Sequence, residues 1–309
     1  MASQPFVVVN PLARRASSAV AEVVGQCDRL GIPIPRSLAT TREQPGSAQA
    51  RQALDSGADM VIVIGGDGTV RQVARELAGT DTRISIVALG SGNVLAYNLG
   101  LANHDLATKI SIALTGPSVE LDVGWANLQT ASGQRFDEPF LTMAGIGRDA
   151  QTVARTRLSS KVRIGAAAYA LHGVRQAIRP PLPMKVQLDD DQPESVLTWT
   201  VLAGLTRQAP GGVVVYPDAR PDDGLMDVLQ VPIRNPVQWL PVAAKGVLNP
   251  DLDVAVLRYQ QAERLRVRPF DPLPAQLDGD VVNRVVAMDA RIQPRGLRVQ
   301  VPPECRDGA

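Results

Sequence analysis

Residues 60–69 read MVIVIGGDGT. The five apolar residues at the start of this stretch show no polar alternation, which is typical of a strand buried on both faces of a parallel sheet. They are followed by three glycines around one carboxylate, Gly65, Gly66, Asp67 and Gly68. Glycine lets backbone amides turn toward a bound anion, and anions bind at the carboxyl ends of parallel strands. The stretch therefore predicts a buried strand that ends in a phosphate-binding turn.

Asp67 is the one charged side chain in this turn. A carboxylate repels phosphate, so Asp67 needs a cation or a proton donor beside it. It can hold Mg²⁺ that bridges nucleotide phosphates, or it can take a proton from an attacking hydroxyl. Thr69 can cap the following helix or donate a hydrogen bond to a phosphate. The alternative is an ordinary strand-to-helix turn with an aspartate cap.

The surrounding sequence predicts an α/β domain. Apolar strands at 5–10 and 84–89 and a weaker strand at 32–38 alternate with helical patterns at 17–30, 46–56 and after 69. Such alternation predicts a parallel sheet covered on both faces. Two further strands also end in small or polar residues. The strand at 5–10 ends in Asn10 and Pro11, with Arg14 just beyond, and the strand at 84–89 is followed by Gly90, Ser91, Gly92 and Asn93. We expect these turns to meet the Gly65–Thr69 turn at one edge of the sheet.

The second half of the chain is rich in short β segments. After about residue 117 the sequence alternates short apolar runs with turn residues, which predicts an antiparallel sandwich or barrel. A helical stretch at 147–179 interrupts this pattern. We therefore expect an α/β domain over residues 1–122 and a β-rich domain over 123–294, with the tail at 295–309 returning to the first domain.

Composition excludes several classes of protein. The 309 residues are 45% hydrophobic and 20% charged, with a net charge of +1, so the chain has enough apolar residues for a core and no overall charge that would attract nucleic acid. Two distant cysteines indicate a reduced, cytoplasmic compartment. The start of the sequence does not resemble a signal peptide, and no apolar run approaches the ~20 residues of a membrane-spanning helix.

A basic segment at 155–185 is the one candidate for contact with a membrane. Residues 151–188 contain no acidic residue and several arginines and lysines, together with an alanine-rich stretch. Such a segment can bind anionic lipid at the inner face of the membrane. The alternative is a solvated helix that packs its alanines on the sheet.

Several motifs together resemble the diacylglycerol kinase catalytic-domain family, which includes bacterial lipid kinases, sphingosine kinases and ceramide kinases. They are VVVNP at 7–11, VIVIGGDGTVRQVARELAG at 61–79, ALGSGNVLAYNLG at 88–100, MAGIGRDA at 143–150, GGVVVYPDARPDDGLMDV at 211–228 and LDGD at 277–280. The resemblance covers nearly the whole chain. Kinases of NAD and of fructose 6-phosphate share a similar glycine turn, so the first domain is expected to have their fold.

The resemblance implies an ATP- and Mg²⁺-dependent kinase that phosphorylates the hydroxyl of a lipid such as diacylglycerol. It implies a nucleotide site made of the three turns named above together with Pro11, Arg14 and Thr41. Asp278 is then the candidate general base and Asp67 the residue that organises Mg²⁺, although relatives differ on which of these two aspartates is the base. A second Mg²⁺ is expected at the Asp223 side chain and the Leu225 carbonyl.

Other readings stay open for these residues. The sequence around Asp278 is also a strong hairpin signal, and the aspartates near 223 can form a solvated turn. Asp149, next to Arg148, is expected near the acceptor site. Asp280 replaces the usual glutamate and Leu205 a common asparagine, so activity can be reduced. The alternatives are an NAD kinase-like enzyme and a catalytically weak nucleotide- or lipid-binding regulator. A homodimer is compatible with the sequence.

Overall fold

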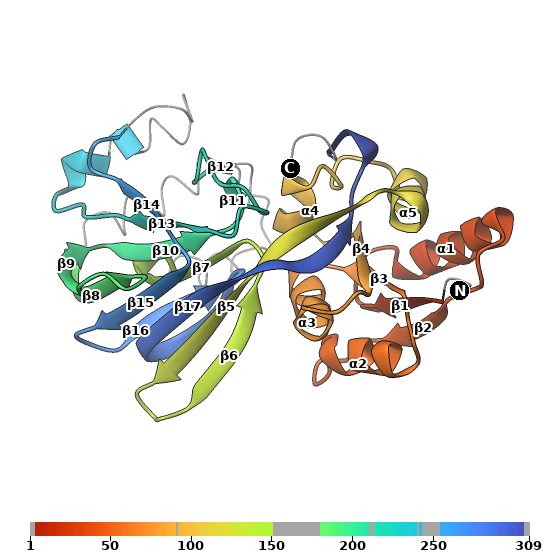
Figure 1. Cartoon of the computed structure of the whole chain (residues 1–309), viewed down its shortest axis with the longest axis horizontal. Coiled ribbons are helices and arrows are strands. Elements are labelled where there is room, and N and C mark those ends of the chain that lie inside the picture. The colour runs from red at the N-terminus through yellow and green to blue at the C-terminus, as the bar shows by residue number, and fades with distance from the viewer. Residues whose placement is uncertain are drawn as a thin grey trace. The chain divides into compact units, whose positions relative to one another are not determined.

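The computed structural model describes residues 4–90, 92–150, 180–209, 213–239, 241–242 and 254–305 (Figure 1). The chain divides into two compact units. Unit 1 contains Met1–Val123, Pro221–Asp223 and Pro294–Ala309, and unit 2 contains Gly124–Arg220 and Gly224–Gln293. The short segment 221–223 therefore belongs to unit 1, although it lies between two parts of unit 2 in the sequence.

Unit 1 is built on a parallel sheet. Its strands are β1 (Pro5–Val9), β2 (Arg36–Ala39), β3 (Met60–Gly65) and β4 (Arg83–Ala88), in the order β4–β3–β1–β2. All six residues of β3 are buried, which explains its uninterrupted apolar sequence. The end of β17 (Asp280–Gln300) adds to this sheet beside β4, where Val299 pairs in parallel with Ile84. The predicted α/β class is confirmed.

Helices supply the cover for this sheet. They are α1 (Ala16–Leu30), α2 (Ser47–Asp55), α3 (Asp67–Leu77), α4 (Val94–Asn98) and α5 (Leu106–Thr115). Apolar residues of α1 and α5 form one core cluster with every second residue of β1 and β3, such as Val7 and Ile62. The helices α2 and α3 contact each other, and α3 contacts β3 and β4.

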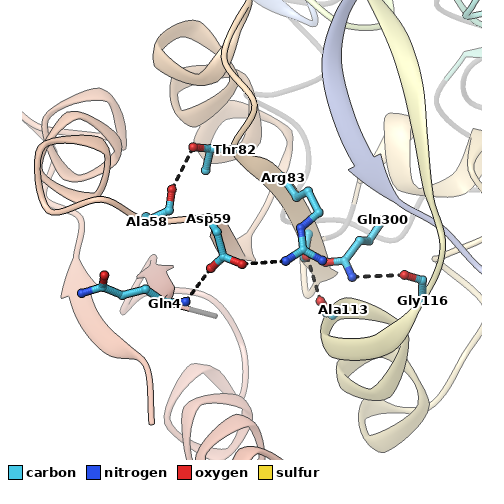
Figure 2. Close-up of polar contacts among 9 residues, drawn as sticks. Gln4, Ala58, Asp59, Thr82, Arg83, Ala113, Gly116 and Gln300 are labelled. Carbon is cyan, nitrogen blue, oxygen red and sulfur yellow. Dashed lines mark hydrogen bonds and ion pairs between the residues drawn. The ribbon is translucent and has the colours of Figure 1, made fainter. Parts of the chain in front are cut away.

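Polar side chains brace unit 1 at the amino ends of its strands (Figure 2). Asp59, just before β3, accepts a hydrogen bond from the Gln4 amide at 2.6 Å and pairs with Arg83 at 2.8 Å. Near the end of β17, Gln300 donates to the Gly116 carbonyl at 3.2 Å (Figure 2). The contacts of Asp59 hold β1, β3 and β4 at the edge opposite their carboxyl ends, and the Gln300 bond ties β17 to the residue after α5.

Unit 2 is a β sandwich-like domain, as predicted. One layer follows the order β14–β13–β10–β7–β16–β17, and in the other layer β9, β8, β15, β17, β5 and β6 pair in succession. A large apolar cluster lies between the layers and includes Ile146, Val201, Val228, Val186 and Val267. The strands β5 and β17 begin or end in unit 1 and so belong to both units.

The strands of unit 2 have the following bounds. They are β5 (Ser118–Thr130), β6 (Arg135–Phe140), β7 (Met143–Gly147), β8 (Leu182–Leu188), β9 (Glu194–Thr198), β10 (Thr200–Gly204), β13 (Met226–Gln230), β14 (Arg258–Ala262), β15 (Arg264–Pro269) and β16 (Leu273–Leu277), with β11 (Gln208–Ala209) and β12 (Val213–Val214) as a separate ribbon. None of the helices in the described ranges is long and apolar enough to cross a membrane.

Some predicted strands were wrong in extent. The strand expected over 32–38 begins only at Arg36, because Pro33 and Pro35 have no backbone N–H for a sheet. Two apolar runs of the second half, PFLTMAG at 139–145 and VLTWTVLAG at 196–204, are each shared by two strands: the first is divided at residues 141 and 142 between β6 and β7, and the second at Trp199 between β9 and β10. An apolar run alone does not show where a strand turns.

Candidate functional site

The predicted turns of unit 1 begin at one edge of the parallel sheet. The Asn10 amide after β1 donates to the Ile64 carbonyl of β3 at 2.9 Å. The Leu89 amide after β4 donates to the Gly65 carbonyl at 3.2 Å, and the Thr40 amide after β2 donates to Val9 at 2.8 Å. All four strands therefore end side by side, and each predicted turn starts where its strand stops.

The two glycine turns after β3 and β4 contact each other. A Cβ atom on Gly90 would lie 3.0 Å from the Gly66 Cα and 2.9 Å from Asn93 Oδ1. A Cβ atom on Gly92 would lie 3.1 Å from Asp67 Oδ2. The backbones are close enough that a side chain at Gly90 would push the turns apart, so the sequence needs glycine there.

Asn93 holds the second turn closed. Its backbone has a left-handed φ of 40°, its side chain is buried, and its Nδ2 donates to the Gly90 carbonyl at 2.6 Å. Asparagine tolerates this backbone conformation better than most residues. The sequence predicted a phosphate contact for Asn93, and the structure adds that this side chain also shapes the turn.

Asp67 is the first residue of α3 and is partly buried. A carboxylate in the first turn of a helix is stabilised by the unpaired amides and the helix dipole. The side chain of Thr69 is buried and packs on Gly65, where a Cβ atom would lie 3.1 Å from Thr69 Oγ1. Asp67 thus lies at a helix N-terminus and directly against the backbone of the neighbouring turn.

The remaining predicted nucleotide residues lie in loops at the same edge. Asn10 Oδ1 accepts from the Leu12 amide at 3.0 Å, and Thr41 Oγ1 accepts from the Gln44 amide at 3.1 Å. Pro11 and Arg14 are exposed. Ser91 and residues 155–179 of the predicted basic segment lie outside the described residues.

The late aspartate turn is a hairpin, as the sequence predicted. Leu277 of β16 pairs with Asp280 of β17, and the two residues between them, Asp278 and Gly279, both have positive φ, at 46° and 86°. This is the conformation that Asp-Gly favours in two-residue hairpins. It directs the Asp278 side chain toward the connection between β6 and β7.

Four donors bind the carboxylate of Asp278. Its Oδ1 accepts from the Thr142 amide at 2.9 Å, the Thr142 hydroxyl at 2.6 Å and the Met143 amide at 3.0 Å. Its Oδ2 accepts from the Leu141 amide at 2.8 Å. Asp278 is therefore an anchor for residues 141–143. Among the described residues Oδ2 has one such donor, which leaves a lone pair that a hydroxyl could use.

Asp149 lies on the outer face of the layer of unit 2 that contains β7, β10 and β16. A Cβ atom on Gly145 of β7 would lie 2.7 Å from Asp149 Oδ2, so the missing side chain makes room for the carboxylate. The Thr200 hydroxyl of β10 contacts the other carboxylate oxygen. Burial raises the pKa of Asp149 to about 6, against hydrogen bonds from the Thr200 hydroxyl and the backbone that lower it.

Tyr216 is a residue of this face that the sequence reasoning missed. Its ring packs where a side chain on Gly204 would lie, with Cε2 only 2.0 Å from the position of a Cβ atom. Its hydroxyl is buried without a hydrogen-bond partner in the described structure, and burial raises the pKa of Tyr216 well above its ordinary value. Asp149 and Asp227 raise this pKa further. Thr200 and Gln276 were missed as well.

A pattern in the sequence could have indicated this face. Gly145 and Gly147 alternate along β7, and Thr200, Leu202 and Gly204 alternate along β10, with Leu202 paired to Gly145. Gln276 of β16 also pairs with Gly145. Glycines at alternate positions of a strand clear one face of a sheet, which marks a close approach of other groups.

The predicted metal ligands lie in different segments. Asp223 belongs to the 221–223 segment of unit 1, in which the Pro221 carbonyl accepts from the Asp122 amide at 2.8 Å. Leu225 belongs to unit 2, and Asp67, the third predicted ligand, begins α3 of unit 1. Within the described ranges, no group of three or more His, Cys, Asp or Glu side chains could hold a metal ion. Mg²⁺ commonly binds through one or two carboxylates, water and phosphates, so the predicted ligands stay a prediction.

Comparison with known proteins covers both units. The diacylglycerol kinase catalytic domain matches residues 4–126, and the YegS C-terminal NAD kinase beta sandwich-like domain matches residues 142–301. The diacylglycerol kinase of Bacillus subtilis strain 168 is 26% identical over 283 residues, which cover 89% of this chain and 88% of that protein. A diacylglycerol kinase of Mycobacterium tuberculosis is 32% identical over 181 residues, 57% of this chain and 56% of its own.

Solved structures show the same fold. The crystal structure of a diacylglycerol kinase from Bacillus anthracis strain Sterne matches with a TM-score of 0.72 at 19% identity, over 98% of both chains. Yeast NADH kinase matches with a TM-score of 0.51 at 10% identity, over 100% of this chain and 86% of that one. The two family domains together match most of the chain, and its two glycine turns meet beside Asp67. This chain therefore belongs to the diacylglycerol kinase family of lipid kinases.

Proposed function

We propose that this lipid kinase transfers the γ-phosphoryl group of ATP to the hydroxyl of a membrane lipid, with diacylglycerol as the first candidate. The observation that carries the proposal is the contact between the two glycine turns, in which the backbones of Gly66 and Gly90 meet beside Asp67. Helix N-termini and glycine turns at a sheet edge bind phosphates through backbone amides. The names of the relatives support diacylglycerol as acceptor.

The donor set at the first turn fits a magnesium ion. Asp67 supplies a hard oxygen ligand at a helix N-terminus, next to amides that would bind phosphate. When bound, Mg²⁺ would neutralise the charge that develops on the transferred phosphoryl group. Asp67 would hold the ion, and Asn93 would keep the neighbouring turn in place. Asp223 and the Leu225 carbonyl are proposed for a second ion.

Asp278 is proposed as the general base through its Oδ2 atom. The hydrogen bonds to residues 141–143 would fix the carboxylate in one orientation. A base that is held in place removes a proton without first losing conformational freedom. Asp149 and Asp280 are proposed to lie near the acceptor.

An assay with radiolabelled ATP and a panel of lipids tests this function. The panel contains diacylglycerol, a sphingoid base, phosphatidylglycerol and a polyprenol, with NAD as a non-lipid acceptor. We expect label in an organic-extractable product that depends on added Mg²⁺. Label in NADP would instead indicate an NAD kinase, and no labelled product would indicate a regulator.

Asp67→Asn is the informative variant for the site. It keeps the volume of the side chain but removes the charge, so we expect turnover to fall at least about 100-fold while the protein stays folded. Asp28→Asn, on the exposed surface of α1, is the matched control and should keep the activity of the parent. Equal turnover in both variants would remove Asp67 from the mechanism.

A further inference from the structure

The second layer of unit 2 has an outer face that carries many basic residues. In this layer β9, β8, β15 and β17 pair in succession (Figure 1). The buried residues of β15, Leu265 and Val267, point into the core. Residues at alternate positions must point outward, because successive side chains of a strand lie on opposite faces.

Strand pairing places five basic side chains together on this outer face. Lys185 of β8 pairs with Arg268 of β15, and Arg264 of β15 pairs with Arg291 of β17. Arg266 lies between Arg264 and Arg268 on the same side of β15. Partners across a strand pair share a face. We call the set Lys185, Arg264, Arg266, Arg268 and Arg291 the basic face.

Three charges of the basic face are not neutralised by carboxylates. Arg268 pairs with Asp289 at 2.6 Å and Arg291 pairs with Asp137 at 3.1 Å. Throughout the described ranges, Lys185, Arg264 and Arg266 form no ion pair. Asp289 lies across from Arg266 in the strand pairing but contacts Arg268, and Arg266 donates to the neutral Gln187 at 3.2 Å. Since the whole chain has a net charge of only +1, this face concentrates positive charge.

An exposed aromatic side chain lies at the end of the basic face. Phe270 directly follows β15, is 61% exposed, and is held by its amide, which donates to the Pro183 carbonyl at 3.2 Å. A large apolar side chain beside cations is the combination that peripheral proteins use at a membrane, where the charges bind lipid phosphates and the ring enters the headgroup region.

We propose that the basic face, with Phe270, docks this kinase on an anionic lipid bilayer. The proposal rests on the proposed function to the extent that a lipid acceptor lies in a membrane. It uses no residue of 151–179, and Lys185 is the one residue that it shares with the basic segment predicted at 155–185. A broad sheet face suits a bilayer surface, and the positive charge complements anionic headgroups.

Vesicle sedimentation tests the proposal. The full-length protein is mixed with phosphatidylcholine vesicles that either contain or lack phosphatidylglycerol, at low and high salt. We expect binding only to the anionic vesicles, with weaker binding at high salt because exposed charges are screened. The face variant replaces three side chains, Lys185→Gln, Arg264→Gln and Arg266→Gln.

The face variant should bind anionic vesicles about 100-fold more weakly, because each basic residue near an anionic surface strengthens binding by roughly 5-fold. The control variant makes the same change in net charge elsewhere on the exposed surface, through Arg29→Gln, Arg234→Gln and Arg258→Gln. It should bind like the parent. Phe270→Ala should weaken binding at both salt concentrations, since an apolar contact is not screened.

Several results would overturn the proposal. The proposal is wrong if the face variant binds anionic vesicles as tightly as the parent does. It is also wrong if the parent protein binds an oligonucleotide but does not bind anionic vesicles. A thermal melt checks that each variant is folded, and the double variant Lys185→Gln/Arg264→Gln replaces the triple one if that unfolds. Activity is measured separately with a short-chain diacylglycerol in neutral detergent micelles, where the face variant should match the parent. No activity of the parent there would refute diacylglycerol as the acceptor, and the vesicle result would still decide this inference.

Discussion

Asp278→Asn should destabilise unit 2, whatever its effect on catalysis. An asparagine has one acceptor oxygen where aspartate has two. In one orientation the asparagine oxygen still accepts the three hydrogen bonds that Thr142 and Met143 donate. The new NH₂ group then faces the Leu141 N–H, so that two donors oppose each other. If the side chain flips, three donors lose their acceptor.

The magnitude follows from the number of hydrogen bonds. Hydrogen bonds to a charged group each contribute about 1.5–3 kcal/mol, and a buried donor left without a partner costs about 1–3 kcal/mol. Losing the Leu141 bond and weakening the other three should therefore lower the free energy of unfolding by about 3 kcal/mol. For a domain of this size, a change of that magnitude lowers the melting temperature by roughly 6–12 °C.

The measurement is a denaturant titration and a thermal melt at neutral pH, with Asp280→Asn as the control. Asp280 ends the same hairpin, so its replacement removes a charge from the turn but leaves the anchor to residues 141–143. Turnover is then measured below the melting temperature of each variant. If the free energy of unfolding of Asp278→Asn lies within about 1 kcal/mol of that of the parent, the four hydrogen bonds do not hold the connection between β6 and β7.

Three further predictions concern other residues. The pKa of Asp149 in the folded protein, about 6, lies above its ordinary value of 3.8, so the folded state favours the protonated carboxyl. The stability that this preference contributes is fully present below pH 3.8 and is lost as the pH rises through 6. Asp149→Asn should therefore be more stable than the parent above pH 6, by roughly 3 kcal/mol, and the advantage should vanish in acid, as denaturant titrations across pH will show. Gly90→Ala should raise the KM for ATP about 10-fold with the fold retained. The new Cβ atom would press on Gly66 and Asn93, and such overpacking costs about 1–3 kcal/mol. An unchanged KM would mean that the two turns need not touch for ATP to bind. Tyr216→Phe removes a buried hydroxyl without a partner in the described structure and should raise stability by about 1 kcal/mol in a thermal melt, whereas a loss would show that the hydroxyl is hydrogen-bonded in solution.

The parts of the candidate site that the sequence predicted are local ones. The turn after β3 could be predicted because five apolar residues and a run of glycines are adjacent in the chain. The hairpin at Asp278 could be predicted because Asp-Gly favours positive φ at both positions. In each case the conformation depends on a few consecutive residues.

The parts that the sequence reasoning missed come from separate strands. Thr200 of β10 contacts Asp149, and Gln276 of β16 lies beside Gly145 of β7, only because both strands flank β7. The donors to the Asp278 carboxylate lie more than a hundred residues earlier in the chain. No local pattern reports such pairs, because strand order and register are set by packing of the whole domain.

Hydrophobic periodicity and backbone preferences over short stretches were enough to predict the parallel sheet of unit 1, the β-rich character of unit 2 and the glycine turns around Asp67. Contacts between separate segments could be read only from the fold: Gly90 packs against Gly66, Asp278 anchors the connection between β6 and β7, and five basic residues of β8, β15 and β17 share one face. Local conformation depends on neighbouring residues, whereas contacts between strands depend on a register that the buried core sets for all of them at once.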